Sequence, residues 1–255
     1  MSILNVYYSA DPESPLAVGQ LAMHQGCIYF EYDAGFLHSG LELSPFLLPI
    51  KTGAVHADPT PWHGLFGLFN DSLPDGWGLL LMDRHLKSLG VETRFLTPLD
   101  RLAYVGKRAM GALTYEPAQD MDGAAFDIDL PLMANSAMDI YEGHASQLLP
   151  QMARAGGSPG GARPKILIHI CKDHMLSGEG EPPEGYESWI VKFFSHVDPL
   201  DTGRVEHAYS LMAKDAGILM PETRLFESGD GKAWFGIKRF DRTDKKRIHM
   251  HTLGG

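Results

Sequence analysis

A glycine-rich loop that leads into an apolar strand carries the clearest chemical signal in this sequence. The loop reads GGSPGGARPK at 156–165, and the strand ILIHI follows at 166–170. Glycines let a backbone turn tightly and bring its N–H groups against a phosphate, and the terminal lysine adds a positive charge. Because clusters of Gly, Ser and Pro are also ordinary turns, the loop by itself indicates phosphate binding only weakly.

A lysine inside a second apolar strand strengthens that indication. The β-forming segment ESWIVKFF at 187–194 has its apolar run interrupted by Lys192, whose charge needs a partner. Glu206 follows in a helical stretch at 204–217. A strand lysine followed by a helix glutamate is the arrangement with which protein kinases hold ATP phosphates. The alternative interpretation is a surface lysine on an edge strand and a solvated glutamate.

The stretch at 204–217 has the apolar period and the end signals of a helix. Asp201 or Thr202 can cap its start, and Gly217 can end it. One face of this helix, at spacings i, i+3, i+4 and i+7, consists of Val205, Ala208, Tyr209 and Met212.

Six stretches in a fixed order resemble the HipA family of serine/threonine kinases, the toxin halves of bacterial toxin–antitoxin pairs. They cover nearly the whole chain, which makes the resemblance specific although each stretch alone is weak. The stretches are NDSLPDGWG at 70–78, LDRLAYVGKRAMGAL at 99–113, the loop GGSPGGARPK, ESWIVKF, VEHAYSLMAKDAGI and KRFDR.

The resemblance implies an ATP site and one modified serine. Ser158 would be the loop serine that family members phosphorylate on themselves. The other implied residues would contact or orient ATP: the backbone at Gly160 and Gly161 and the side chain of Lys165 at its phosphates, Lys192 at the α/β-phosphates, Glu206 as the partner that orients Lys192, and Phe240 and Asp241 beside the nucleotide.

We expect an α+β fold with two domains. By resemblance, residues 1–115 form a small N-terminal α/β cap, and residues 130–255 form a kinase-like N-lobe, an antiparallel sheet with one long helix. The cap is expected to contain strands at 3–8, 16–23 and 27–33 and a helix at 74–90. A helix at 132–154 is expected to break near Gly143 or Pro150, and 172–187 is expected to form an exposed loop.

The sequence departs from the family in one respect. Family members continue into a helical C-lobe that supplies a catalytic Asp and a metal-binding Asn in an N-x-D-D-H loop, and no D-D-H tripeptide occurs here. We therefore expect the front half of a kinase, with no catalytic or metal-ligating residue of its own and no activity alone. ATP is the implied cofactor, and the Mg²⁺ ligands are expected in the absent C-lobe. The alternative is a non-catalytic binding or regulatory module that engages an antitoxin or a kinase partner.

Composition limits the partners. The formal net charge of −10 argues against direct binding of nucleic acid, which requires Lys and Arg at phosphates. The sequence has no apolar run of membrane-spanning length, and its first residues lack the basic and apolar regions typical of a signal peptide, so we expect a cytoplasmic protein. The resemblance implies a HipB-like helix-turn-helix antitoxin as partner and a protein substrate, in some relatives an aminoacyl-tRNA synthetase.

Several polar residues are interpreted as structural. Asp71 and Asp75, in FNDSLPDGWG, are typical of capping and turn positions, although carboxylates there could also act as metal ligands or bases. Cys27 and Cys171 are interpreted as small buried residues. His169, His174, His249 and His251 lack an obvious third ligand, so no metal site is expected.

Overall fold

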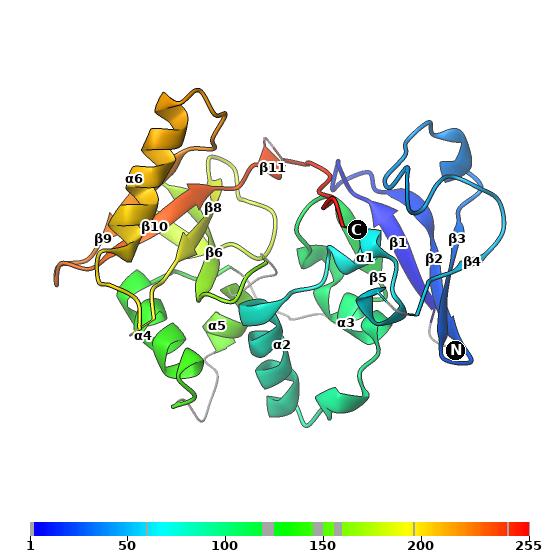
Figure 1. Cartoon of the computed structure of the whole chain (residues 1–255), viewed down its shortest axis with the longest axis horizontal. Helices are drawn as coiled ribbons and strands as arrows, with labels where there is room; N and C mark the ends of the chain where they lie inside the picture. The colour runs from blue at the N-terminus through cyan, green and yellow to red at the C-terminus, as the bar shows by residue number, and fades with distance from the viewer. Residues whose placement is uncertain are drawn as a thin grey trace. The chain divides into compact units, whose positions relative to one another are not determined.

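The computed structural model describes residues 3–59, 61–118, 125–144, 150–155, 160–195, 197–243 and 245–254. Within these ranges the fold is α+β, as predicted, and every strand pairing is antiparallel (Figure 1). Two compact units divide the chain: unit 1 comprises Met1–Pro74, Glu92–Asp122 and Asp241–Gly255, and unit 2 comprises Asp75–Val91 and Gly123–Phe240.

Unit 1 is built on a five-stranded sheet in the order β4-β3-β2-β1-β5. Its three predicted strands are confirmed, because alternate apolar residues such as Leu4, Val6 and Phe30 are buried on one face. Its elements are β1 (Ile3–Tyr8), β2 (Leu16–His24), β3 (Cys27–Tyr32), β4 (Val55–His56), β5 (Leu113–Glu116), α1 (Gly67–Asn70), α3 (Pro98–Val105), β11 (Arg242–Thr243), β12 (Lys246–Arg247) and the short 3₁₀ turns η1 (Phe36–His38), η2 (Pro61–Gly64), η3 (Thr93–Phe95) and η4 (Gly106–Arg108).

Unit 2 is built on a second five-stranded sheet in the order β7-β6-β8-β10-β9. The strands expected after the glycine-rich loop and around Lys192 are confirmed. The segment 172–187 is not simply a loop: four of its residues form a strand that pairs with the preceding one. The strands are β6 (Lys165–Cys171), β7 (His174–Ser177), β8 (Glu187–Lys192), β9 (Thr223–Glu227) and β10 (Ala233–Lys238).

Helices α2 (Gly76–Ser88), α4 (Leu130–Tyr141) and α5 (Pro150–Ala155) share one hydrophobic core with this sheet. Their expected positions are confirmed, and α4 ends two residues before Gly143, whose φ of +79° is the left-handed conformation that stops a helix. In α2, Met82 and Leu86 are buried, whereas Leu89, which follows the last helical residue, is exposed. The sheet contributes alternate residues to the core, among them Ile166, Ile168, Trp189, Val191 and Trp234.

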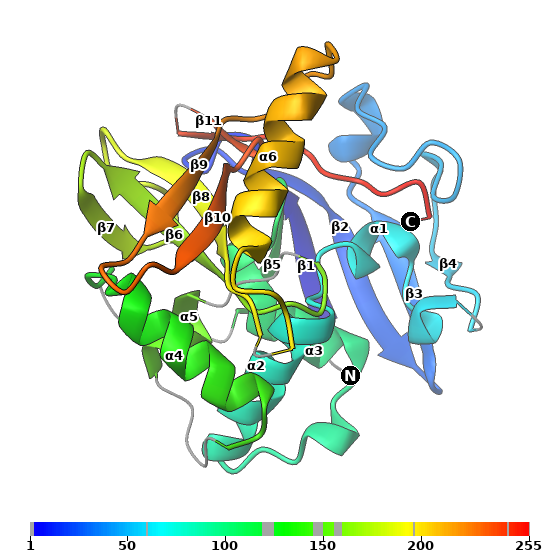
Figure 2. The same ribbon diagram turned by 60° about the vertical axis from the view of Figure 1, so that its left-hand side comes forward.

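Helix α6 (Thr202–Asp215) packs on β9 and β10 (Figures 1 and 2). Its contacts come from small and polar residues, and only Gly203 and Ser210 are buried in it. The apolar face read from the sequence is exposed instead, including Val205, Tyr209 and Met212. Asp201 occupies the N-cap position, but its side chain makes no capping hydrogen bond.

The compact units do not follow chain order. Helix α2, from the first part of the sequence, belongs to unit 2, and residues 241–255 belong to unit 1. The ranges 1–115 and 130–255 therefore stay a prediction about sequence domains. None of the helices in the described part of the chain combines the length and apolar character needed to cross a bilayer.

Candidate functional site

Lys192 and Glu206 form an ion pair within unit 2, and each side chain is 36% exposed. Strand alternation places Lys192 opposite the core face of β8, because its neighbour Val191 is buried in the core. The Lys192 ammonium also lies 5.3 Å from the centroid of the Phe235 ring on β10. The two residues predicted to be partners are thus brought together, with an aromatic ring beside the cation.

A close approach between α6 and β10 makes this pairing possible. A Cβ atom on Gly203 would lie 2.2 Å from the carbonyl oxygen of Ala233, so a larger residue would force the helix away from the strand. At the other end of the interface, the Ser210 and Thr223 hydroxyls are hydrogen-bonded at 2.8 Å. The contacts of Gly203 and Ser210 therefore determine how close α6, and with it Glu206, lies to the sheet.

Lys165 lies next to Lys192 in the register of β6 and β8 and is 4% exposed. Its Nζ donates hydrogen bonds to the carbonyl oxygens of Gly160, at 3.1 Å, and Gly161, at 2.8 Å. The pKa of Lys165 is lowered to about 8, chiefly by burial; the charge of Lys192 adds to this shift, while Asp75 and Glu206 oppose it. Two lysines therefore lie at one end of this sheet, and the lowered pKa of Lys165 means that it loses its proton more readily.

Hydrogen bonds to residues at the start of α2 hold the Gly160–Gly161 turn in place. The Gly161 N–H donates to Oδ1 of Asp75 at 2.6 Å, and the Gly161 carbonyl accepts from the Trp77 N–H at 3.2 Å. The Trp77 indole N–H donates to the carbonyl of Lys165 at 2.8 Å. Asp75 is a site residue that the sequence did not reveal: its partner is 86 positions away.

The exit of the loop is held by a second carboxylate. The Arg163 guanidinium contacts both carboxylate oxygens of Asp198, at 2.9 and 2.8 Å, and donates to the Ser195 hydroxyl at 3.1 Å. Asp198 in turn accepts from the backbone N–H of Ser195 at 2.8 Å. This bidentate contact joins the loop to the segment that follows β8.

Phe240 and Asp241, although adjacent in the chain, belong to different units. Phe240 is 55% exposed at the end of unit 2, and Asp241 belongs to unit 1, where it is fully buried against Arg242. Asp241 also accepts from the Gly111 N–H at 2.9 Å. Their roles beside a nucleotide stay a prediction, and Ser158 lies outside the described residues.

Other residues interpreted from the sequence have the following environments. Asp71 binds the His251 ring and the Thr252 backbone and hydroxyl, at 2.7–2.9 Å, which is a structural role although not a local cap. Cys27 is exposed and Cys171 intermediate, so the prediction that both are buried was wrong. Across the described ranges, no three His, Cys, Asp or Glu side chains are grouped as metal ligands.

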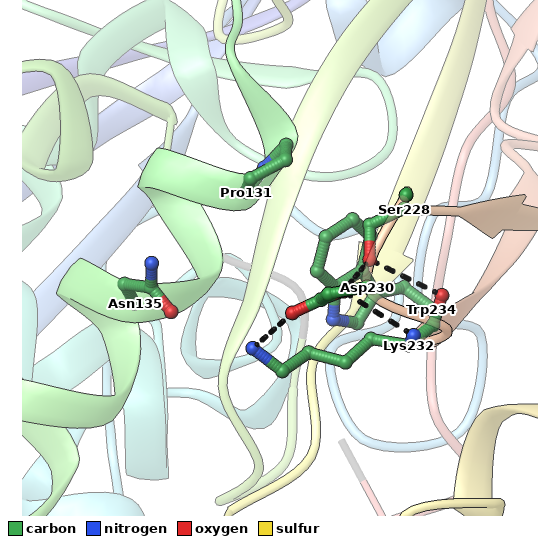
Figure 3. A pocket seen from close by; sticks show the side chains of 7 residues that line it. Pro131, Asn135, Ser228, Asp230, Lys232 and Trp234 are labelled. Atoms are coloured by element: carbon green, nitrogen blue, oxygen red, sulfur yellow. Dashed lines mark hydrogen bonds and ion pairs between the residues drawn. The ribbon is translucent and has the colours of Figure 1, made fainter.

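A pocket of about 250 Å³ in unit 2 lies away from the predicted site residues (Figure 3). It lies between α4 and the β9–β10 turn, and Asn135 and Trp234 contribute to its wall. Its charged groups satisfy each other: Lys232 and Asp230 form an ion pair at 2.8 Å, and Ser228 donates to Asp230. These bonds, above all that from Lys232, lower the pKa of Asp230 to about 2, as expected for a stabilised turn.

Comparison with known families gives two matches. Residues 5–116 match the HipA N-terminal domain, and residues 157–255 match the HipA-like C-terminal domain. The second match begins in the glycine-rich loop and includes Lys165, Lys192 and Glu206. No curated protein matches the chain. Because two successive domains of one family match in order and together cover most of the sequence, the chain is a HipA-like protein.

Proposed function

We propose that unit 2 is the ATP-phosphate-binding lobe of a HipA-like serine/threonine kinase. The observation that carries the proposal is the Lys192–Glu206 ion pair beside Lys165 and the Gly160–Gly161 turn. A lysine on a central strand, held by a glutamate on the helix that crosses the sheet, is how kinases position a cation for phosphates. An antiparallel five-stranded sheet carrying α6 supports the kinase-like N-lobe interpretation.

The side chains present fit a polyphosphate. Lys192 is partly exposed, so its ammonium can contact a ligand while Glu206 keeps it in place. Lys165 adds a second cation at the same end of the sheet, and a backbone N–H of the turn already points at an anionic oxygen. ATP would bring a triphosphate with several negative charges to these three donors.

Calorimetric titration with ATP, with and without Mg²⁺, tests this proposal. We expect Lys192→Ala to lower the affinity at least about tenfold, because a cation in contact with a phosphate contributes over 1 kcal/mol in a partly buried site. Lys214→Ala is the matched control, since it removes an exposed lysine from α6. Equal affinities of wild type and Lys192→Ala would refute a phosphate site at this lysine.

We also propose that these 255 residues do not transfer phosphate unaided. Phosphoryl transfer requires a residue that orients the hydroxyl and carboxylates that hold Mg²⁺, and the family's N-x-D-D-H loop does not occur in this sequence. With labelled ATP, incorporation by the purified chain should not exceed that of Lys192→Ala. Labelling well above this level would contradict the proposal.

Family membership supports a HipB-type helix-turn-helix antitoxin as partner and a protein, such as an aminoacyl-tRNA synthetase, as substrate of the kinase. A net charge of −10 suits a basic partner. Sedimentation of the chain mixed with a HipB-type antitoxin tests the first interaction, and a salt-sensitive complex is expected.

A non-catalytic binding module is the second candidate function. The exposed apolar residues of α6, including Val205, Tyr209 and Met212, favour it, because such a face can hold a protein partner. The titration above separates the two functions. A chain that binds the antitoxin but shows no Lys192-dependent ATP binding would be a module of this kind.

A further inference from the structure

The carboxylate of Asp75 occupies a backbone donor of the glycine turn. Its Oδ1 accepts the Gly161 N–H at 2.6 Å, and a Cβ on Gly160 would lie 3.4 and 3.5 Å from its two oxygens. A carboxylate and a phosphate both present anionic oxygens to such N–H groups. The turn thus already binds an anion, and that anion belongs to the protein.

Asp75 makes this contact in preference to a local one. It stands at the N-cap of α2, where a carboxylate usually accepts from the second or third amide of its own helix, yet it forms no capping bond. A tertiary partner in the turn has therefore displaced the local partners. Those amides give the carboxylate an alternative position within α2 if it is released.

The charges around the turn suit an anion. The Lys165 ammonium lies behind it, bonded to the carbonyls of both glycines, and Lys192 is adjacent to Lys165 in the sheet. Asp75 offsets part of this positive charge, since its carboxylate acts to raise the pKa of Lys165. A phosphate at the Gly161 N–H would meet the same two cations, together with repulsion from Asp75.

We propose that Asp75 is an intramolecular stand-in for a phosphate group, which a polyphosphate must displace from the Gly161 N–H in order to bind the turn. This inference rests on the proposed function, because it concerns the same phosphate site. Asp75 lowers the affinity of that site for every phosphate ligand. It also keeps the turn ordered when no nucleotide is bound.

Titration of the 255-residue chain with ATP and with inorganic triphosphate tests the inference. Asp75→Asn keeps the side-chain shape and removes the charge, so we expect about fivefold tighter binding of both ligands, the repulsion of two charges near contact in water. Asp139→Asn, on the exposed face of α4, makes the same change in net charge and should leave the affinity unchanged.

Hydrogen exchange of a peptide that contains residues 160–162 gives a second readout. Asp75→Ala removes the acceptor, so exchange of the Gly161 amide should be faster than in wild type without ligand. Inorganic triphosphate should restore its protection. Amide exchange that is identical in wild type and Asp75→Ala would overturn the inference even if the affinities change.

The outcomes separate this inference from the proposed function. If Lys192→Ala weakens ATP binding while Asp75→Asn binds no more tightly than wild type, the proposal that phosphate displaces Asp75 is wrong. The proposed ATP site is then still supported. If Lys192→Ala weakens ATP binding and Asp75→Asn binds phosphate ligands more tightly than wild type, both are supported. If no variant binds ATP or triphosphate, both fail together.

Discussion

Two acid–base pairs, one in each unit, contrast in their exposure. Lys192 and Glu206 are each 36% exposed, whereas the side chains of Asp241 and Arg242 are 0% and 3% exposed. The family resemblance implies a contact with the nucleotide for both Lys192 and Asp241. The surroundings of the two pairs differ so much that replacing the basic residue of each pair by methionine should lower the free energy of unfolding by different amounts.

The buried pair is enclosed by backbone groups. Asp241 accepts the Gly111 N–H, and Arg242 donates to the carbonyls of Gly111 at 3.0 Å and Ala109 at 2.9 Å. The exposed pair lies beside one aromatic ring, that of Phe235. A pair with many fixed partners maintains a fold, whereas a pair with few partners can accept a ligand without leaving groups unsatisfied.

The largest expected effect is that of Arg242→Met. It would remove the Arg242 guanidinium from beside the buried Asp241 carboxylate, which costs about 3–5 kcal/mol of unfolding free energy. Urea denaturation measures this change. A loss below 1 kcal/mol would show that the Asp241–Arg242 pair is no more structural than the exposed one.

Gly76→Ala should have the next largest effect. Gly76 has φ +41°, and a Cβ would lie 2.7 Å from Cα of Ala162, which follows the glycine turn. We expect a loss of about 1–3 kcal/mol in urea denaturation. Gly90→Ala is the control: its φ is +80° but no atom lies within 4 Å, so it measures the backbone strain alone. Equal losses in the two variants would mean that contact with the loop costs nothing.

Lys192→Met should change stability little, in contrast to Arg242→Met. Partly exposed ion pairs contribute about 0.2–1 kcal/mol, and the released Glu206 carboxylate remains hydrated. The same urea experiment should therefore give a shift within about 1 kcal/mol. A loss comparable to that of Arg242→Met would remove the distinction between the two pairs.

The smallest expected effect is the uptake of a proton by Lys165 when ATP binds. Its pKa near 8 lies below the 10.5 of an unfolded lysine, so between these values the unfolded chain binds more protons and stability from this group rises with pH. Phosphate binding favours the charged form instead, and ATP affinity should fall as pH rises through 8. At pH 8, calorimetry in two buffers should show uptake of about half a proton, absent in Lys165→Met.

Much of the fold was predictable because it follows local patterns. Apolar runs of β-forming residues predicted the strands around Ile166 and Val191, and Gly143 was one of two predicted breaks in the helix expected at 132–154. The strand β7 was missed, because it is short and stands in a segment, 172–187, whose Gly, Pro and Glu residues are typical of a loop, and only β6 provides its partner. The pairing of Lys192 with Glu206 followed from family resemblance rather than from either residue alone.

The sequence by itself determined most of the longer elements, and it placed the glycine turn and the two lysines of the candidate site at strands, because these features depend on neighbours a few positions away. Only the tertiary structure decided that α6 presents Glu206 rather than its apolar face to the sheet, and that Asp75 binds Gly161 rather than its own helix. The physical reason is competition. Asp75 could accept from the first amides of its own helix, but the packing of unit 2 brings the Gly161 N–H within bonding distance instead.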